Sequence, residues 1–220
     1  GGGFLKDLAV IDVSKIDTRL KDVKITAACD VDNTLCGEKG ASAVYGPQKG
    51  ATPAMVKELD AALANYAFQI KMQLAKDVLD IPGSGAAGGL GAGILTFLNG
   101  DLIPGIKLIL EAADFQQKIK GAVLALTGEG RIDDQTAHGK APMGVAQAAQ
   151  KEGVPVFAFG GILGANYHKV YEKGFDYVGA GVQEIISLEA AMDRGYLLLV
   201  ENVERALRAV KVGMELRRNR

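Results

Sequence analysis

Apolar and polar positions follow two alternating patterns along the second half of the chain. Short apolar runs predict buried strands, and the stretches between them repeat their apolar positions at helical spacing. Strands that alternate with helices are typical of parallel βαβ units, so an α/β fold with a parallel sheet is expected. The predicted strands cover 122–126, 154–159 and 175–178, and the predicted helices cover 105–120, 143–151, 166–172 and, as one or two helices, 187–218.

The first half of the chain has a different pattern. The run 25–29 is rich in small and β-branched residues and predicts a buried strand that ends at Asp30. Thr52 is an N-cap candidate, followed by proline and by apolar residues at helical spacing to about Met72. A stretch of small residues occupies 82–93. We therefore expect a boundary near residue 103, with a different architecture on each side.

The charge and the cysteine content exclude several classes of protein. The 220 residues carry 25 Lys and Arg against 26 Asp and Glu, a formal net charge of −1. This balance provides no basic surface for nucleic acid or for an anionic membrane, so neither is an expected partner. The sequence has neither an apolar run long enough to span a membrane nor a signal-peptide pattern. The two cysteines, Cys29 and Cys36, predict reduced thiols in a cytoplasmic protein.

Candidate chemistry begins at the end of the first predicted strand. Asp30, Asp32 and Asn33 follow the apolar run, and a loop punctuated by glycine and proline then delivers Lys49. Carboxylate oxygens bind divalent metals, and a lysine ammonium binds phosphate as a point charge. The sequence therefore predicts a polar site that suits a divalent metal, a polyol or a phosphate.

Two segments of the second half follow predicted strands and contain several glycines. They are expected to be loops, 127–136 and 160–164, and ligands of open parallel sheets bind at such loops. An acid and a guanidinium between glycines offer a bidentate contact to an anion, whereas the second loop is also compatible with an ordinary tight turn. Both loops suit a nucleotide or a phosphorylated group, through Gly128, Glu129, Gly130 and Arg131 in the first and Gly160 and Gly161 in the second.

A G-x-G-x-x-G pattern is formed by Gly83, Gly85 and Gly88, but its context does not fit a dinucleotide site. A proline interrupts the preceding run, and Asp101 follows an Asn-Gly turn rather than a second strand. Close packing of the backbone against a helix explains the small residues, and contact with a phosphate is the alternative.

The segment Asp30-Val31-Asp32-Asn33-Thr34 also matches D-x-D-x-T. This pattern resembles the nucleophile motif of haloacid-dehalogenase-type phosphotransferases, in which the first carboxylate attacks phosphorus. The glycine usual after the second aspartate is Asn33 here, and no later predicted strand ends in a pair of acids. A phosphotransferase that uses Asp30 as its nucleophile is one alternative function, and a non-catalytic ligand-binding module is another.

Four longer segments carry a family resemblance, in the order 28–33, 40–52, 82–93 and 127–142. Together they resemble the glycerate kinase family of bacterial glyoxylate and sugar-acid catabolism, of the glycerate 2-kinase type. The resemblance implies ATP-dependent phosphorylation of D-glycerate to 2-phosphoglycerate, with magnesium. It also implies two α/β domains: residues 1–103 as part of an inserted substrate domain, and 104–220 as the C-terminal part of a Rossmann-like or flavodoxin-like parallel-sheet domain, here incomplete.

The sequence departs from the family pattern at three places. Thr34 stands where the family usually has proline, and Val123 stands where it usually has aspartate. Neither change removes an obvious ligand. Members of the family also carry a longer N-terminal part whose loops should help to form the site. The 220 residues are therefore expected to be a fragment of the full enzyme.

Roles for the first set of polar residues follow as hypotheses from the resemblance and from the chemistry of phosphoryl transfer. This reaction needs alignment of the reactants and positive charge near the transferred group. Asp30 or Asp32 would hold magnesium or act as the base on a glycerate hydroxyl, and Asp32 is favoured. Asn33 would orient the substrate, and Lys49 would neutralise phosphate charge.

The second set lies on the other half of the chain. Arg131, with Glu129, would hold the substrate carboxylate or position the metal, because a guanidinium can contact a carboxylate at two points. The complete set of candidates is catalytic Asp30, Asp32, Lys49 and Arg131; substrate-binding Asn33, Gly128, Glu129, Gly130, Thr136 and Lys140; nucleotide- or phosphate-binding Gly83, Gly85, Gly160 and Gly161; and metal-binding Asp32 and Glu129.

Overall fold

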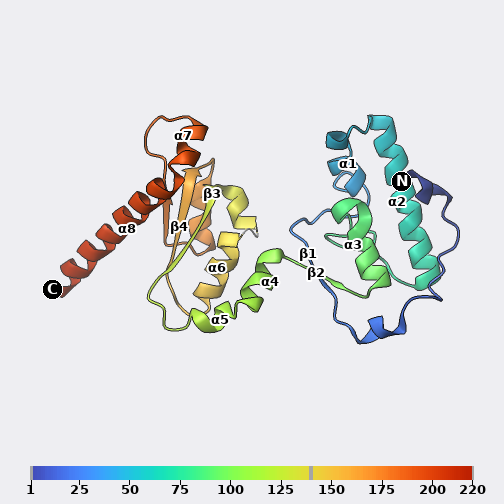
Figure 1. The fold of residues 1–220 in the computed structure, drawn as a ribbon, viewed down its shortest axis with the longest axis horizontal. Coiled ribbons are helices and arrows are strands. Elements are labelled where there is room, and N and C mark those ends of the chain that lie inside the picture. The colour runs from blue at the N-terminus through green and yellow to red at the C-terminus, as the bar shows by residue number, and fades with distance from the viewer. Residues whose placement is uncertain (1, 139–140, 220) are drawn as a thin grey trace. The chain divides into compact units, whose positions relative to one another are not determined.

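The computed structural model describes residues 2–138 and 141–219, and the chain divides into two compact units, Gly1–Gly105 and Ile106–Arg220 (Figure 1). Each unit contains parallel strands and helices, so the prediction of an α/β fold with parallel sheets is confirmed. The assignment of one unit as a substrate domain and the other as part of a Rossmann-like domain stays a prediction. No helix within the described ranges is both long and apolar enough to cross a bilayer.

The first unit consists of helices that pack on one another and of a small two-stranded sheet. Strand β1 (Thr26–Ala28) pairs in parallel with β2 (Asp101–Ile103). The long helix predicted from Thr52 is present as α2 (Pro53–Leu74), and the Thr52 side chain accepts a hydrogen bond from the backbone of Met55, as expected for an N-cap. The remaining elements are η1 (Gly2–Asp7), η2 (Thr18–Asp22), α1 (Ala41–Tyr45), η3 (Pro47–Lys49) and α3 (Ala86–Phe97), and the core gathers Leu35, Ala41, Leu63, Ala67, Ile70, Val78 and Ala92.

Strand β2 was not among the predicted strands, and Asp101 was expected to follow an Asn-Gly turn rather than a second strand. Asn99 lies in the left-handed region at φ 46°, and the Gly100 N–H donates to the Ile94 carbonyl at 3.1 Å, just after the end of α3. The strand has only three residues, too few to show a period, and its hydrogen bonds come from β1, which lies far away in the sequence. Long-range pairing of this kind leaves no local signal.

The second unit is built on a three-stranded parallel sheet in the order β3-β4-β5. One face packs against α6, whose Met143, Ala146 and Ala149 share a buried cluster with strand residues such as Val178. The adjacent Gly179 faces Asn202 of α8, so α6 and α8 cover opposite faces. The elements are α4 (Gly105–Ala112), α5 (Phe115–Lys118), β3 (Ala125–Ile132), η4 (Asp134–His138), α6 (Ala141–Gln150), β4 (Val156–Leu163), η5 (Tyr167–Lys173), β5 (Tyr177–Ala180), α7 (Leu188–Asp193) and α8 (Gly195–Arg218).

Three predictions for the second unit were wrong in detail. The helix expected over 105–120 is interrupted at Asp114, whose φ is +49°, and the helix expected over 166–172 is 3₁₀. The glycine-containing segments that were expected to be loops from residues 127 and 160 belong to strands instead. Strand β3 continues to Ile132, and β4 continues to Leu163. Glu129 pairs with Gly160 in this extension. Pairing between the strands outweighs the low strand propensity of glycine.

Candidate functional site

Asp30 holds the end of β1 to the start of α4. Its Oδ1 accepts a hydrogen bond of 2.7 Å from the backbone N–H of Gly105. A Cβ atom at residue 105 would lie 3.1 and 3.2 Å from the two carboxylate oxygens, so glycine leaves the room that this contact needs. A carboxylate that is engaged in this way is better suited to holding the backbone than to attacking phosphorus.

Asp32 lies two residues further along and is exposed. No group among the described residues donates a hydrogen bond to its carboxylate, in contrast to Asp30. A carboxylate free of local partners can accept a proton or bind a cation, which favours Asp32 over Asp30 for the predicted base.

Both polar atoms of the Asn33 side chain form hydrogen bonds inside the first unit. Its Oδ1 accepts a hydrogen bond of 2.5 Å from the Tyr45 hydroxyl, and its Nδ2 donates to the Lys39 carbonyl at 2.8 Å. Its backbone carbonyl accepts from the N–H groups of Gly83 and Gly85 at 3.1 and 3.0 Å. Asn33 therefore joins three segments of the unit, and its predicted role in orienting substrate stays a prediction.

The glycine-rich segment packs closely against this same turn. The N–H groups of Gly83 and Gly85 both donate to Asn33, so in this structure they do not point to a phosphate. A Cβ at residue 85 would overlap the carbonyl oxygen of Thr34, and one at residue 91 would overlap that of Gly83. Backbone packing, the first of the two interpretations weighed above, accounts for these glycines.

Lys49 lies at the end of η3, is exposed, and forms no ion pair with any residue in the described ranges. It borders a cavity of about 200 Å³ together with Ser42, Tyr45 and Gly88. Ligand pockets usually have about 300–1,000 Å³, so this cavity suits a molecule of only a few atoms. The Lys49 loop and the glycine-rich segment thus meet at a small pocket that has a cation at its rim.

The second unit contains a larger cavity, of about 940 Å³, at the carboxyl ends of its strands. Ligands of open parallel sheets bind at this edge. Most of its lining is apolar, and α7 and α8 supply Leu188, Met192 and Leu199, which were not among the predicted site residues. Their only signal was apolar positions in the helices expected over 187–218. The predicted site residues that line it are Gly128, Glu129, Gly130, Arg131, Gly160 and Gly161.

Two residues that follow β3 form hydrogen bonds to the two charged side chains of this cavity, Glu129 and Arg131. The Thr136 hydroxyl donates to the Glu129 carboxylate and accepts from the backbone N–H of Asp133 at 3.1 Å. The Asp133 carboxylate accepts from Arg131 Nε at 3.0 Å. A Cβ at Gly164 would lie 2.7 Å from that Nε, so glycine permits the arrangement. Asp133 was missed as a site residue, although it stands two positions after the arginine.

Thr136 is completely buried, and its hydroxyl donates to the Glu129 carboxylate. The structure thus shows a contact of Thr136 with another predicted site residue. Its predicted role in substrate binding stays a prediction.

We expect Thr136→Val to lower the free energy of unfolding of the second unit by about 1–3 kcal/mol, because the Asp133 N–H loses its acceptor inside the protein. Slowly exchanging amides of β3 and β4 report this opening. Thr136→Ser keeps the hydroxyl and should lose less stability than the valine variant. Equal losses for valine and serine would show that the methyl group and not the hydroxyl matters.

One other predicted site residue, Lys140, lies outside the described ranges. Within those ranges, no three or more His, Cys, Asp or Glu side chains could together hold a metal. In phosphoryl-transfer sites Mg²⁺ is held by one or two carboxylates together with phosphates and water, so the chemistry of Asp32 or of Glu129 fits such an ion.

Cys29 and Cys36 are both free thiols. Burial, with Asp60 and Asp80 nearby, raises the pKa of Cys36 from 9.0 to about 12, so the thiol stays protonated at neutral pH. At pH 8 we expect its alkylation by iodoacetamide to be about 1,000-fold slower than that of an ordinary thiol, because only the thiolate reacts. Mass spectrometry of labelled peptides measures this rate. In about 6 M urea, which is strongly denaturing, Cys36 should react at the rate of an ordinary thiol. Fast labelling of Cys36 in the folded protein would contradict its burial.

Comparison with known proteins identifies close relatives along the whole chain. A model of the glycerate kinase family matches residues 1–211. A glycerate kinase of Halalkalibacterium halodurans is 53% identical over 212 residues, which are 96% of this chain and 55% of that protein. The glycerate 2-kinase of Escherichia coli K12 is 45% identical over 210 residues, 96% of this chain and 54% of that protein.

A solved structure agrees with these relatives. The crystal structure of a protein assigned as glycerate kinase 2 from Salmonella typhimurium LT2 matches with a TM-score of 0.76 and 43% identity, over 100% of this chain and 56% of that one. The chain thus spans about half the length of the relatives it matches. On the match over 1–211 and on these identities, the chain belongs to the glycerate kinase family.

Proposed function

We propose that this chain is part of an enzyme that transfers the γ-phosphoryl group of ATP to D-glycerate, with Mg²⁺, to give 2-phosphoglycerate and ADP. The observation that carries the proposal is the cavity at the carboxyl ends of β3 and β4, where Glu129 and Arg131 of the family motif meet in one hollow. The name of the Escherichia coli relative supports the 2-hydroxyl as the acceptor. The cytoplasm, which supplies ATP and keeps Cys29 and Cys36 reduced, is the compartment that this proposal implies.

The residues of the first unit would act on the sugar acid. The Asp32 carboxylate would take the proton from the 2-hydroxyl of glycerate as its oxygen attacks the γ-phosphorus, and ADP leaves. The ammonium group of Lys49 would balance negative charge on the phosphate or the acid. A bound Mg²⁺ would supply further positive charge to the phosphate oxygens.

The residues of the second unit would bind an anionic group. Among the described residues, the Arg131 guanidinium bonds to Asp133 through Nε, and its terminal nitrogens would bind a carboxylate or phosphate. Thr136 holds the Glu129 carboxylate, which would take a cation. A phosphotransferase that uses Asp30 as nucleophile is less favoured, since Asp30 is bonded to Gly105.

The test uses a full-length chimera, in which these 220 residues replace the matched stretch of the Halalkalibacterium halodurans relative. ATP consumption should saturate with D-glycerate and require both substrates, and ³¹P NMR should identify 2-phosphoglycerate. The unmodified relative is the positive control. A folded chimera that is stabilised by glycerate or ATP without turnover would support a non-catalytic module, and a 3-phosphoglycerate product would contradict the proposed acceptor.

A further inference from the structure

The Arg131 side chain borders the large cavity of the second unit and is 58% exposed. An exposed arginine has many rotamers of similar energy, and a guanidinium binds an anion at two points only when its plane is oriented. Among the described residues, this guanidinium bonds to Asp133 alone, through Nε at 3.0 Å. The position of the Asp133 carboxylate therefore decides where the terminal nitrogens of Arg131 lie.

The Asp133 carboxylate is itself held in place. Its side chain is only 13% exposed, and Oδ1 accepts a hydrogen bond from the backbone N–H of Gln135 at 3.0 Å, while Oδ2 accepts from Arg131. Asp133 is not among the residues that line the cavity, whereas Arg131 is. An acceptor that is tied to the backbone and set back from the cavity can orient Arg131 without touching a ligand.

Gly164 lies against the other side of this pair. It directly follows β4, and its N–H donates to the Ile132 carbonyl of β3 at 2.7 Å. A Cβ at residue 164 would lie 2.7 and 3.0 Å from Nε and Nη2 of Arg131 and 2.8 Å from the Cβ of Asp133. Gly164 is not among the glycines with positive φ, so its backbone conformation does not require glycine. The space that the Arg131–Asp133 pair occupies is the reason for a glycine here.

Another aspartate and arginine two residues apart provide a comparison within the same chain. Asp17 accepts hydrogen bonds from the Nε and Nη2 of Arg19 and caps η2, but these side chains are 47% and 87% exposed. Exposed ion pairs of this kind contribute little. The Arg131–Asp133 pair differs because its carboxylate is shielded from water and because a glycine after the neighbouring strand leaves room for it.

We propose that Asp133 is a positioning residue and that Gly164 makes room for it, so that together they direct the terminal nitrogens of Arg131 to the anionic oxygens of a substrate. The inference rests on the proposed function, in which this anion belongs to the sugar acid or to ATP. Carboxylate and phosphate groups share the pair of oxygens that a guanidinium contacts at two points. An oriented contact of this kind aligns the substrate for the transfer.

The first experiment needs no substrate and follows the Arg131 Nε–H signal in ¹⁵N–¹H spectra of the 220-residue chain. Its loss in Arg131→Lys identifies the signal. Exchange of this proton with water should be at least about tenfold faster in Asp133→Asn, because its acceptor is lost. Gly164→Ala should have the same effect, since the methyl group takes the space of the guanidinium. Equal exchange in the unmodified chain and in Asp133→Asn would overturn the inference.

The second experiment measures turnover in the full-length chimera, where Asp133→Asn should lower kcat/KM by about tenfold or more. The asparagine oxygen accepts a backbone N–H as well as a carboxylate does, so the bond from Gln135 is kept, whereas the amide nitrogen cannot accept from Nε. A purely structural role of Asp133 predicts no loss. A rise in the KM for glycerate would assign the anion to the sugar acid, and a rise in the KM for ATP would assign it to the nucleotide.

A double-mutant cycle shows whether Asp133 acts through Arg131. When Arg131→Ala is already present, adding Asp133→Asn should change kcat/KM by less than about twofold, because no guanidinium remains to be oriented. An equal loss with and without Arg131→Ala would overturn the inference. An equal loss together with a raised Mg²⁺ requirement would assign Asp133 to the metal instead.

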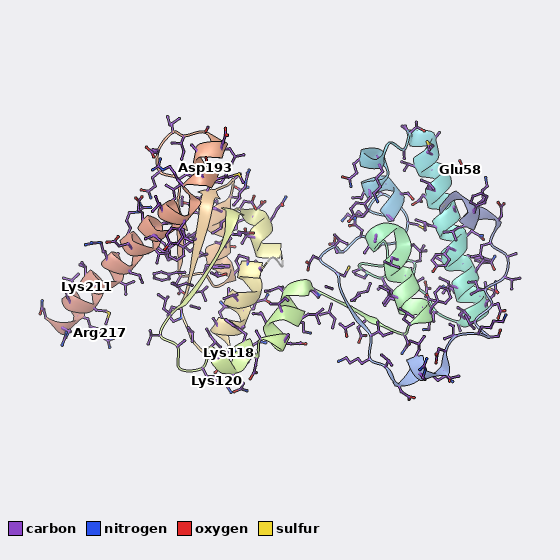
Figure 2. All side chains as sticks on the ribbon, in the orientation of Figure 1. Glu58, Lys118, Lys120, Asp193, Lys211 and Arg217 are labelled. Carbon is purple, nitrogen blue, oxygen red and sulfur yellow. The ribbon has the colours of Figure 1, made fainter. Side chains whose placement is uncertain are left out.

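Three control variants should leave both the Nε–H exchange and kcat/KM unchanged. Asp17→Asn alters the exposed pair of the first unit, and Asp193→Asn alters an exposed carboxylate of α7 that is labelled in Figure 2. Gly213→Ala adds a methyl group where no atom lies within 4 Å. A chimera without turnover, in a protein whose Arg131 Nε–H is protected by Asp133, would refute the proposed reaction and support the positioning. Turnover that Asp133→Asn leaves unchanged would do the reverse.

Discussion

In the full-length chimera, Asp32→Asn is expected to lower kcat by about 10²–10⁴-fold, the usual contribution of a general base. The amide that replaces the carboxylate cannot take the proton from the glycerate hydroxyl. The KM for glycerate should change little, because the lost interaction develops as the proton moves. Asp32 is exposed and accepts no hydrogen bond from the described residues, so the melting temperature should stay unchanged.

Two further variants make this test selective. Asp22→Asn alters an exposed carboxylate elsewhere in the first unit and should leave kcat unchanged. Asp30→Asn keeps an oxygen that can accept from Gly105, so the fold is preserved while the carboxylate is lost. Loss of turnover in Asp30→Asn with normal turnover in Asp32→Asn, together with a phosphorylated aspartate, would exchange the proposed roles in favour of nucleophilic catalysis.

The largest expected effect on stability comes from Gly85→Ala. The new methyl group would overlap the Thr34 carbonyl oxygen, a backbone atom next to the turn that Asn33 holds. Because backbone cannot move aside as a flexible side chain does, we expect a loss of about 3 kcal/mol or more in the free energy of unfolding of the first unit. Slowly exchanging amides of α2, in the core of that unit, measure the loss.

Gly93→Ala in α3 is the matched control, since a Cβ there meets only the Tyr66 hydroxyl at 3.6 Å, an ordinary contact. Alanine is favoured over glycine inside a helix, so this variant should be stabilised by up to about 1 kcal/mol. The same change of residue is thus expected to have opposite effects eight positions apart. Similar effects of the two substitutions would mean that crowding at Gly85 is relieved by movement of the turn.

Residue patterns alone identified several of the residues that line the two cavities. The segments quoted for the family resemblance include Glu129 and Arg131, which line one cavity together with Gly160 and Gly161. In the first unit, Lys49 reaches the rim of a pocket shared with Gly88 of the glycine-rich segment. Residue type alone did not distinguish Asp30, Asp32 and Asn33, but their hydrogen bonds do. The side chains of Asp30 and Asn33 have partners inside the first unit, whereas that of Asp32 has none among the described residues.

The sequence by itself determined the α/β class and the long helix α2 with its Thr52 cap. These features depend on neighbours within a few residues, whose periodicity and capping chemistry can be read directly. Tertiary structure decided the rest: the strand β2, the extension of β3 and β4 through glycines, and the burial of Thr136. Each of these depends on hydrogen bonds or packing between segments remote in sequence, and such contacts outweigh local propensity without leaving a periodic pattern.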